Sequence, residues 1–309
     1  MKDICRAAAR TFLGALTVII SVNILAAGLL VATLQSRNDL YLPLAGANPR
    51  EDAAEVMAGG QPLFADCREV SIVSADGLTL RGRLWMRGGM HRWVVLVHGY
   101  SNSSDDMLSL GRTLWNSGYN LLLPDLRAHG ASDGKTVGMG WKDRDDLIEW
   151  MELIKDGDPE ANIALMGVSM GASAALMTAA ECGSVCAVVS DCAYSELGAL
   201  MEYHLRCDLG LPSFPVAWFG DVISKSAAGY GWYEVSALEQ VKKSAVPTLF
   251  IHGGDDVFVP VDMAYELYGA AAGPKELLIM EGAGHAMSRY TDAVLYDETV
   301  LDFLGRYVR

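Results

Sequence analysis

The sequence predicts an α/β fold in which a mostly parallel central sheet carries helices on both faces. Strand-like apolar runs alternate with helix-like segments through most of the chain, and this alternation is typical of βαβ units. Glycine and apolar residues are spread evenly after the N-terminus, which favours one large domain over two small ones in a chain of 309 residues. A chain of this length buries a sizeable core.

Residues 1–35 are predicted to form an N-terminal membrane anchor. No residue from Thr11 to Leu34 is charged. As a helix, these 24 residues would be about 36 Å long, which exceeds the roughly 30 Å of a bilayer's hydrocarbon core. We therefore expect a transmembrane helix.

Basic residues precede this apolar stretch and predict its orientation. Lys2, Arg6 and Arg10 are expected to remain in the cytoplasm, so the protein would be a single-pass protein of the cell membrane with its main domain outside the cytoplasm. The alternative is a signal peptide whose cleavage would release a secreted protein. The apolar region of a signal peptide usually runs to only about 15 residues, which favours the uncleaved anchor.

Residues 36–66 are predicted to be a tether, because they mix Asn, Pro, Gly and charged residues without clear periodicity. The main domain would then comprise residues 67–309. Asp76-Gly77 separates two strand-like runs and predicts a hairpin at an antiparallel edge of the sheet. The predicted strands comprise residues 70–73, 78–85, 93–97, 120–123, 162–166, 187–190, 247–251 and 276–279. The predicted helices comprise residues 105–117, 141–155, 172–180, 261–271 and 291–307.

One stretch of the predicted domain, from about residue 194 to residue 245, interrupts this alternation. It contains Pro212 and Pro215 and is rich in aromatic residues. An insertion of this size between two strands is typical of a small helical cap over an active site. We expect most of its aromatic side chains to pack the cap onto the domain and a few to line a pocket.

Charge and cysteine content exclude several classes of protein. The formal net charge is −14, and no run of Lys or Arg appears outside the extreme N-terminus, so a nucleic-acid partner is not expected. Six cysteines are too few for a disulfide scaffold in a chain of this length. The sequence has no C-x-x-C motif or other metal-site spacing, so neither a metal nor another cofactor is predicted.

Gly167-Val168-Ser169-Met170-Gly171 is the most informative motif in the chain. It follows an apolar strand-like run and precedes a helix-like run of small residues, so Ser169 is expected on a strand-to-helix turn. Such a turn holds a serine hydroxyl out toward a substrate carbonyl, and the flanking glycines let strand and helix approach closely. The motif therefore predicts a nucleophilic serine.

A nucleophilic serine needs a base, and the base needs an orienting carboxylate. His285 is the predicted base, because it lies in a glycine-bounded loop after a predicted strand, where ligands bind in open α/β sheets. His98, His129 and His252 also follow strands. For each of these three, a role in loop structure is the alternative.

The predicted carboxylate lies where a strand ends in glycines followed by Asp255 and Asp256. One of these aspartates would hold His285, and the other would cap a helix or stabilise the loop. The residue pattern alone leaves the choice between them open. The order serine, aspartate, histidine along the chain is the order expected on this architecture.

Two backbone N–H groups are predicted to form an oxyanion hole. The N–H of Met170 opens the helix after the serine and would point at a developing oxyanion. Gly99 follows a predicted strand and would let the turn bring the N–H of Tyr100 toward Ser169. Because both donors are backbone groups, the side chain of Tyr100 is expected to shape the pocket wall.

These segments resemble the α/β-hydrolase superfamily, and the likeness covers roughly residues 70–309. His98-Gly99 resembles the oxyanion segment, and residues 125–132 resemble the D-x-R-x-x-G-x-S loop, whose residues in the family are mainly structural. Residues 167–171 match the nucleophile elbow. The resemblance implies the α/β-hydrolase fold.

Two further segments of this resemblance concern the acid and the base. Residues 252–260 match H-G-x-x-D-x-x-V-P, which assigns the acid to Asp256 rather than Asp255, and Gly284-His285 matches the catalytic histidine. The resemblance therefore implies a catalytic triad of Ser169, His285 and Asp256. It also extends to bacterial membrane-anchored hydrolases of the serine aminopeptidase-like or esterase-like group.

The sequence is thus interpreted as a serine hydrolase that cleaves an ester, thioester or amide through an acyl-enzyme. A carboxylesterase is expected, because an apolar, aromatic cap suits acyl chains. A peptidase is the alternative, since Glu196, Glu202 and Asp221 of the cap offer carboxylates for a substrate's amino group. A third alternative is a membrane-tethered binding protein that keeps the fold without turnover.

Overall fold

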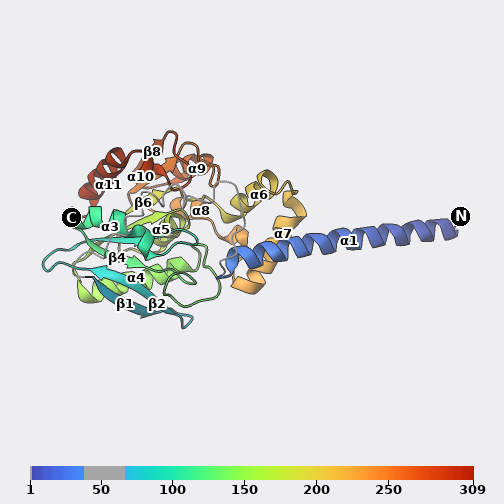
Figure 1. The fold of residues 1–309 in the computed structure, drawn as a ribbon, viewed down its shortest axis with the longest axis horizontal. Helices are drawn as coiled ribbons and strands as arrows, with labels where there is room; N and C mark the ends of the chain where they lie inside the picture. Colours follow the sequence, from blue (N-terminus) through green and yellow to red (C-terminus); the bar gives the residue numbers. More distant parts are fainter. Residues whose placement is uncertain (1, 38–66) are drawn as a thin grey trace.

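The computed structural model describes residues 2–37 and 67–309. In this part of the chain, eight strands form one sheet in the order β1-β2-β4-β3-β5-β6-β7-β8 (Figure 1). The strands are β1 (Arg68–Val73), β2 (Thr79–Trp85), β3 (Arg92–Val97), β4 (Asn120–Pro124), β5 (Asn162–Val168), β6 (Val185–Asp191), β7 (Thr248–Gly253) and β8 (Lys275–Met280). The β1–β2 and β2–β4 pairs are antiparallel and the other pairs are parallel, which confirms the predicted mostly parallel sheet and its hairpin edge.

Helices cover both faces of this sheet. In β3, Trp93, Val95 and Val97 belong to one hydrophobic core, while Val94 and Leu96 belong to the other, because successive side chains of a strand point to opposite faces. The first core lies under α4 (Asp143–Gly157), α5 (Met170–Glu181) and α9 (Asp262–Ala270). The second lies under η1 (Ser104–Met107), α3 (Leu108–Asn116) and α11 (Ala293–Tyr307), which follows the short helix α10 (Ser288–Thr291). The continuous apolar run of β3 is thus explained by burial on both sides.

The insertion between β6 and β7 is helical. It contains α6 (Leu197–Cys207), α7 (Ser213–Ala228), η2 (Trp232–Glu234) and α8 (Ala237–Val241). The expected packing of its aromatic residues onto the domain is found for Tyr230 and Trp232, which are fully buried. It is not found for Phe214 and Trp218, whose exposed fractions are 76% and 50%.

The N-terminal segment forms the long helix α1 (Lys2–Gln35), which projects away from the domain at one end (Figure 1). Its last turns pack against α7, and Ala27, Leu30, Val31 and Leu34 are buried there. Within the described residues, we find no helix with the length and apolar character needed to cross a membrane. The structure therefore does not bear out the predicted transmembrane helix.

The residues at and just after the end of α1 form backbone hydrogen bonds with the domain. The carbonyl of Gln35 accepts a hydrogen bond from the N–H of Val137 at 2.9 Å, and Ser36 forms an antiparallel bridge with Thr136. Residues 38–66, which make up nearly all of the predicted tether, lie outside the described residues. Ser36 and Arg37, the first two residues of the predicted tether, are thus joined to the domain by backbone hydrogen bonds.

Candidate functional site

Ser169 lies on the turn between β5 and α5. Its φ of 56° and ψ of −119° are rare for a residue with a side chain. A Cβ at Gly167 would lie 2.2 Å from the carbonyl oxygen of Gly171, and one at Gly171 would lie 2.3 Å from that of Val97. Both positions therefore require glycine, as the motif predicts, and the turn holds the serine at the carboxyl edge of the sheet.

The structure brings Ser169, His285 and Asp256 together from three loops. The Nε2 atom of His285 lies 2.8 Å from the Oγ of Ser169, and its Nδ1 lies 2.7 Å from the Oδ2 of Asp256. The three residues follow β5, β8 and β7 respectively, so they meet because the carboxyl ends of parallel strands share one edge. The result is a continuous hydrogen-bonded chain from a hydroxyl through an imidazole to a carboxylate.

Asp256 is a buried carboxylate with several donors. Its Oδ1 accepts the backbone N–H groups of Phe258 and Val259 at 2.9 and 2.8 Å. Burial by itself raises the pKa of Asp256, but the hydrogen bonds from His252 and His285 outweigh burial and lower that pKa to about 2. Asp255 is exposed. Of the two adjacent aspartates, only Asp256 therefore lies on the hydrogen-bonded chain.

His252 is a second histidine beside Asp256. From the sequence it was a candidate base, with a role in loop structure as the alternative. Its Nε2 donates to the carbonyl of Val259 at 2.8 Å and lies 3.3 Å from the Oδ2 of Asp256. Burial lowers the pKa of His252, but its hydrogen bond to Asp256 more than offsets burial, so the pKa lies above its ordinary value. The spacing of His252 and Asp256, four residues apart after a strand, was the available signal.

The other two histidines that follow strands hold loops together. The Nε2 of His98 accepts the N–H of Leu126 at 3.0 Å, and the Nε2 of His129 accepts that of Ser101 at 3.2 Å. Burial lowers the pKa of both imidazoles, that of His129 to about 4. They are neutral at physiological pH, which suits their role as acceptors in loop structure.

The two predicted backbone donors are the N–H groups of Met170 and Tyr100. Met170 is the first residue of α5. A Cβ at Gly99 would lie 3.4 Å from the Cβ of Ser169, so the backbone at Gly99, the residue before Tyr100, runs directly beside the serine. The hydroxyl of Tyr100 donates to the carbonyl of Thr33 in α1 at 3.4 Å.

A cavity of about 400 Å³ lies next to this segment. Tyr100, Ser101, Asn102 and His129 line one side, while Ser36 and Arg37 line another. Ser169, Asp256 and His285 do not line this cavity, so the predicted role of the Tyr100 side chain at the serine stays a prediction. The contribution of residues 36 and 37 was not expected, because no local signal links the end of α1 to this loop.

Asp191 and Cys192 form a buried layer beneath the chain from Ser169 to Asp256, and sequence reasoning missed both. The carbonyl of Asp191 accepts the N–H of Ser169 at 2.8 Å, and its carboxylate accepts the hydroxyls of Tyr296 and Ser288 at 2.9 and 3.3 Å. Burial raises the pKa of Asp191 to about 6. Its position at the carboxyl end of β6 was the signal that could have identified it.

The cap contacts the loop that carries Asp256. The hydroxyl of Tyr203 in α6 donates to the carbonyl of Val257 at 3.1 Å. The ring of Phe258 lies between two imidazoles, with centroid distances of 4.9 Å to His204 and 4.8 Å to His285. The cap thus fixes one face of His285 through Phe258.

One group of possible metal ligands lies at this site among the described residues. Atoms of Cys192, Asp256 and His285 all lie within 4.8 Å of one another. Burial raises the pKa of Cys192 well above its ordinary value, so its thiol is a poor ligand. Because Asp256 and His285 are also hydrogen-bonded to each other, the donor set fits proton transfer better than metal binding.

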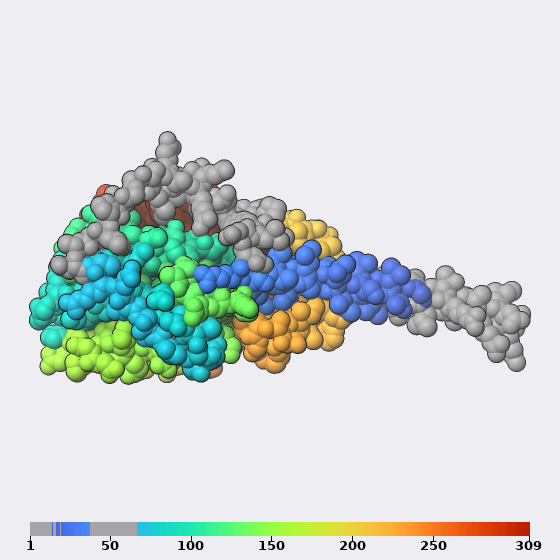
Figure 2. All heavy atoms as spheres, turned by 60° about the horizontal axis from the view of Figure 1, so that its bottom comes forward, coloured from blue at the N-terminus to red at the C-terminus, as the bar shows by residue number. Residues whose placement is uncertain are grey.

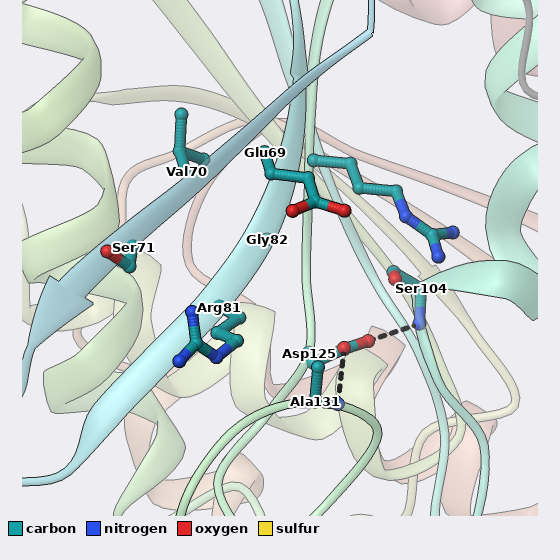
Figure 3. A pocket seen from close by; sticks show the side chains of 9 residues that line it. Glu69, Val70, Ser71, Arg81, Gly82, Ser104, Asp125 and Ala131 are labelled. Atoms are coloured by element: carbon teal, nitrogen blue, oxygen red, sulfur yellow. Dashed lines mark hydrogen bonds between the residues drawn. The ribbon is translucent and has the colours of Figure 1, made fainter.

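A second pocket, of about 280 Å³, lies at the β1–β2 edge (Figure 3). In Figure 3 the carboxylate of Asp125 accepts the N–H groups of Ser104 and Ala131, at 2.7 and 2.8 Å. Arg81 and Glu69 also line this pocket, whereas Ser169, Asp256 and His285 do not. Asp125 thus has a structural role in closing its loop.

Comparisons with known proteins agree with this geometry. The sequence pattern of the Alpha/beta hydrolase family matches residues 94–297. The chain is similar to the uncharacterised protein YqkD of Bacillus subtilis, with 34% identity over 239 residues, 75% of this chain and 77% of YqkD. It is similar to the uncharacterised protein Rv2307c of Mycobacterium tuberculosis, with 28% identity over 302 residues, 95% of each chain. Among solved structures, it is similar to the Pyrococcus furiosus esterase Pf2001, with 25% identity, a TM-score of 0.66, and coverage of 86% of this chain and 96% of the esterase.

Gly171→Ala is expected to destabilise the protein by about 3 kcal/mol or more, because the new methyl group would overlap the carbonyl oxygens of Val97 and His98. Gly157→Ala is the matched control, since a Cβ there meets nothing within 4 Å. That control should change stability by no more than about 1 kcal/mol. Urea unfolding of both variants measures the difference, and equal effects would contradict the steric argument.

Asp256→Asn is expected to lower the free energy of unfolding by about 1–3 kcal/mol at neutral pH, because buried donors lose a charged acceptor. The pKa of Asp256 falls from 3.8 to about 2 on folding. The contribution of Asp256 to the free energy of unfolding is therefore fully present above its pKa in the unfolded chain. That contribution is lost as the pH falls from about 4 toward about 2.

Thermal unfolding at several pH values measures this contribution. The difference in Tm between the parent and Asp256→Asn should be constant near neutral pH and shrink below about pH 4. Asp255→Asn, the same change at an exposed neighbour, should stay within about 0.5 kcal/mol of the parent at every pH. A difference for Asp256→Asn that is independent of pH would refute the assignment.

Proposed function

Because this chain belongs to the alpha/beta hydrolase family, we propose that it is a serine hydrolase that cleaves a carboxylic ester through an acyl-enzyme. The observation that carries the proposal is the hydrogen-bonded chain from Ser169 through His285 to Asp256. A serine hydroxyl is a weak nucleophile at neutral pH, and an adjacent imidazole held by a carboxylate is the arrangement that activates it.

In the proposed reaction, the Oγ of Ser169 attacks the carbonyl carbon of the ester while the Nε2 of His285 takes its proton. The imidazolium then returns that proton to the leaving alcohol, and an acyl-serine remains. Water, deprotonated by the same nitrogen, attacks the acyl-serine, and His285 returns the proton to the Oγ of Ser169 as the carboxylic acid leaves. The backbone N–H groups of Tyr100 and Met170 would stabilise the oxyanion, each contributing about 3–4 kcal/mol in the transition state.

The electrostatics around Asp256 support this role. A carboxyl group whose pKa is about 2 stays ionised throughout the reaction, so it stabilises the imidazolium that forms on His285. The N–H groups of Phe258 and Val259 fix the other oxygen of the carboxylate. The imidazole is thereby held with its Nδ1 proton toward Asp256 and its Nε2 toward the serine.

The cap favours an ester over a peptide as substrate. An aminopeptidase needs a carboxylate for the amino group of its substrate, but the three candidates already accept hydrogen bonds within the cap. Glu196 accepts from the hydroxyl of Ser236, Glu202 from that of Tyr233, and Asp221 from the N–H of Tyr233. Because these carboxylates already have partners, carboxylesterase activity is the proposal. A serine aminopeptidase-like peptidase is the alternative.

A separate proposal concerns location. We infer that the N-terminal helix attaches the protein to the cell membrane with the hydrolase domain outside the cytoplasm. The uncharged stretch from Thr11 to Leu34 and the basic residues before it support this placement. Flotation of the purified full chain with lipid vesicles tests the attachment, and a chain that stays in the unbound fraction contradicts it.

Ser169→Ala is expected to lower kcat/KM for p-nitrophenyl esters by at least about 10³-fold with the fold intact, because the nucleophile is lost. A fluorophosphonate probe should label the parent and not this variant. Ser71→Ala, on the exposed edge strand β1, is the control and should behave like the parent. Unchanged hydrolysis by Ser169→Ala, or no labelling of folded parent protein, would favour a binding protein without turnover.

A panel of p-nitrophenyl esters and aminoacyl anilides separates the two hydrolase proposals. We expect kcat/KM for the best ester to exceed that for the best anilide by at least about 10-fold, because the cap carboxylates are engaged. Preferential cleavage of anilides, lost in Glu202→Gln but kept in Glu149→Gln outside the cap, would establish the peptidase instead.

A further inference from the structure

Exposed apolar side chains gather on one part of this molecule. Large hydrophobic residues with exposed side chains occur throughout the described residues, but most of them lie on α1 or at the start of the cap. On these elements they are Val18, Ile20, Val22, Ile24, Leu25 and Leu29 of α1, and Leu209, Phe214, Trp218 and Val222 of the cap. We call these ten residues the α1–α7 apolar surface. A patch of this kind marks a contact with another apolar phase or partner.

On α1, the most exposed members form a stripe. Val18, Val22, Leu25 and Leu29 are spaced four, three and four residues apart, so they share one face of the helix. The opposite face is the one that packs on the domain through Leu30 and its buried neighbours. Since no residue from position 11 to position 34 is charged, the helix lacks the polar outer face of a helix that faces water.

On the cap, the apolar members lie on α7, which packs against α1, or shortly before it. Trp218 and Val222 are one turn apart on α7, and Phe214 precedes them. The opposite face of α7, including Val216 and Gly220, is buried. Figure 2 shows α1 and α7 side by side at the end of the molecule from which α1 projects. From position 209 to position 220, no residue of the cap is charged.

Buried hydrogen bonds fix α1 to α7. The Nε2 of Gln35 donates to the hydroxyls of Ser224 and Tyr230 at 2.7 and 3.0 Å. Tyr230 in turn donates to the carbonyl of Val137 at 2.8 Å, and Ser224 donates to the carbonyl of Tyr230 at 2.7 Å. Because these donors and acceptors are buried, α1 cannot swing freely on the cap. Whatever covers α1 therefore also approaches α7.

We infer that the α1–α7 apolar surface contacts a lipid bilayer, so that the cap as well as the N-terminal helix touches lipid. Phe214 and Trp218 supply the aromatic side chains that favour the boundary between headgroups and acyl chains. Lys2, Arg6 and Arg10 precede the uncharged stretch and complement anionic headgroups. A second copy of the chain is the other occupant that the experiment below distinguishes.

The inference rests on the proposed membrane attachment and adds the orientation of the domain. Attachment through α1 alone leaves the cap in water, whereas the inference places Trp218 among lipid chains. Of the seven tryptophans, Trp85, Trp93, Trp150 and Trp232 are fully buried, while Trp218 is half exposed. Trp115 and Trp141 are partly buried. Emission comes from all seven tryptophans, so a quencher confined to lipid is needed to single out Trp218.

The experiment uses the full chain bound to vesicles of phosphatidylcholine and phosphatidylglycerol, with phosphatidylcholine brominated on its acyl chains as the quencher. Bromine quenches only tryptophan that it contacts, so we expect a quenched fraction in the parent that Trp218→Phe abolishes. Trp115→Phe, at a partly buried tryptophan in α3 outside the α1–α7 apolar surface, should retain it. The far-ultraviolet circular dichroism spectrum of each variant checks that it is folded.

A second measurement weakens the surface itself. The double variant Phe214→Ser with Trp218→Ser should reduce the floated fraction several-fold, while Val294→Ser with Leu295→Ser, at exposed apolar residues of α11, should leave it unchanged. Flotation of the parent without quenching that depends on Trp218 would overturn the inference and leave the attachment standing. No flotation would overturn both. A dimer in detergent that the Phe214 and Trp218 double variant dissociates, without quenching by lipid, would assign the surface to a second copy.

Discussion

The close approach of β5 and α5 is the steric constraint on which the candidate site depends. Gly167 and Gly171 leave no room for a Cβ, and Ser169 between them adopts a backbone conformation that residues with side chains rarely take. The surrounding sheet and helix enforce this conformation, because both are buried on either side of the turn. The hydroxyl is therefore held at the edge of the sheet where the loops that carry Asp256 and His285 also end.

The pKa of each buried carboxyl group at this edge of the sheet depends on the hydrogen-bond donors that surround it. Asp256 has two imidazoles and two backbone N–H groups as partners, and its pKa falls to about 2. Asp191 has only two hydroxyl donors, and burial raises its pKa to about 6. Two carboxyl groups close to the same histidine are thus driven to opposite sides of their ordinary pKa. As the pH falls through about 6, Asp191 takes up a proton while Asp256 stays ionised.

The N-terminal helix is joined to the hydrolase domain at its last turns. Its end contributes Thr33 to a contact with Tyr100, Gln35 to a buried network with the cap, and Ser36 and Arg37 to a cavity wall. The sequence predicted an anchor and a tether here, but the end of this segment contacts the loop that contains Tyr100. This connection gives a physical route by which membrane contact and the site would be related.

The sequence by itself determined the features that depend on neighbouring residues. The alternation of strands and helices, the hairpin at Asp76-Gly77 and the strand-to-helix turn at Ser169 follow from local periodicity and turn chemistry, and the structure has each of them. The convergence of Ser169, Asp256 and His285 could also be predicted, because parallel strands end at one edge of the sheet.

Only the tertiary structure decided the contacts between residues that are far apart in the chain. Gln35 and Ser224 are 189 residues apart, and nothing near either predicts their hydrogen bond. The packing of whole elements likewise decides where His252 and Asp191 lie around the site. It also decides that Phe214 and Trp218 are exposed. Local patterns specify elements and turns, whereas burial and partners are fixed only when the elements are assembled.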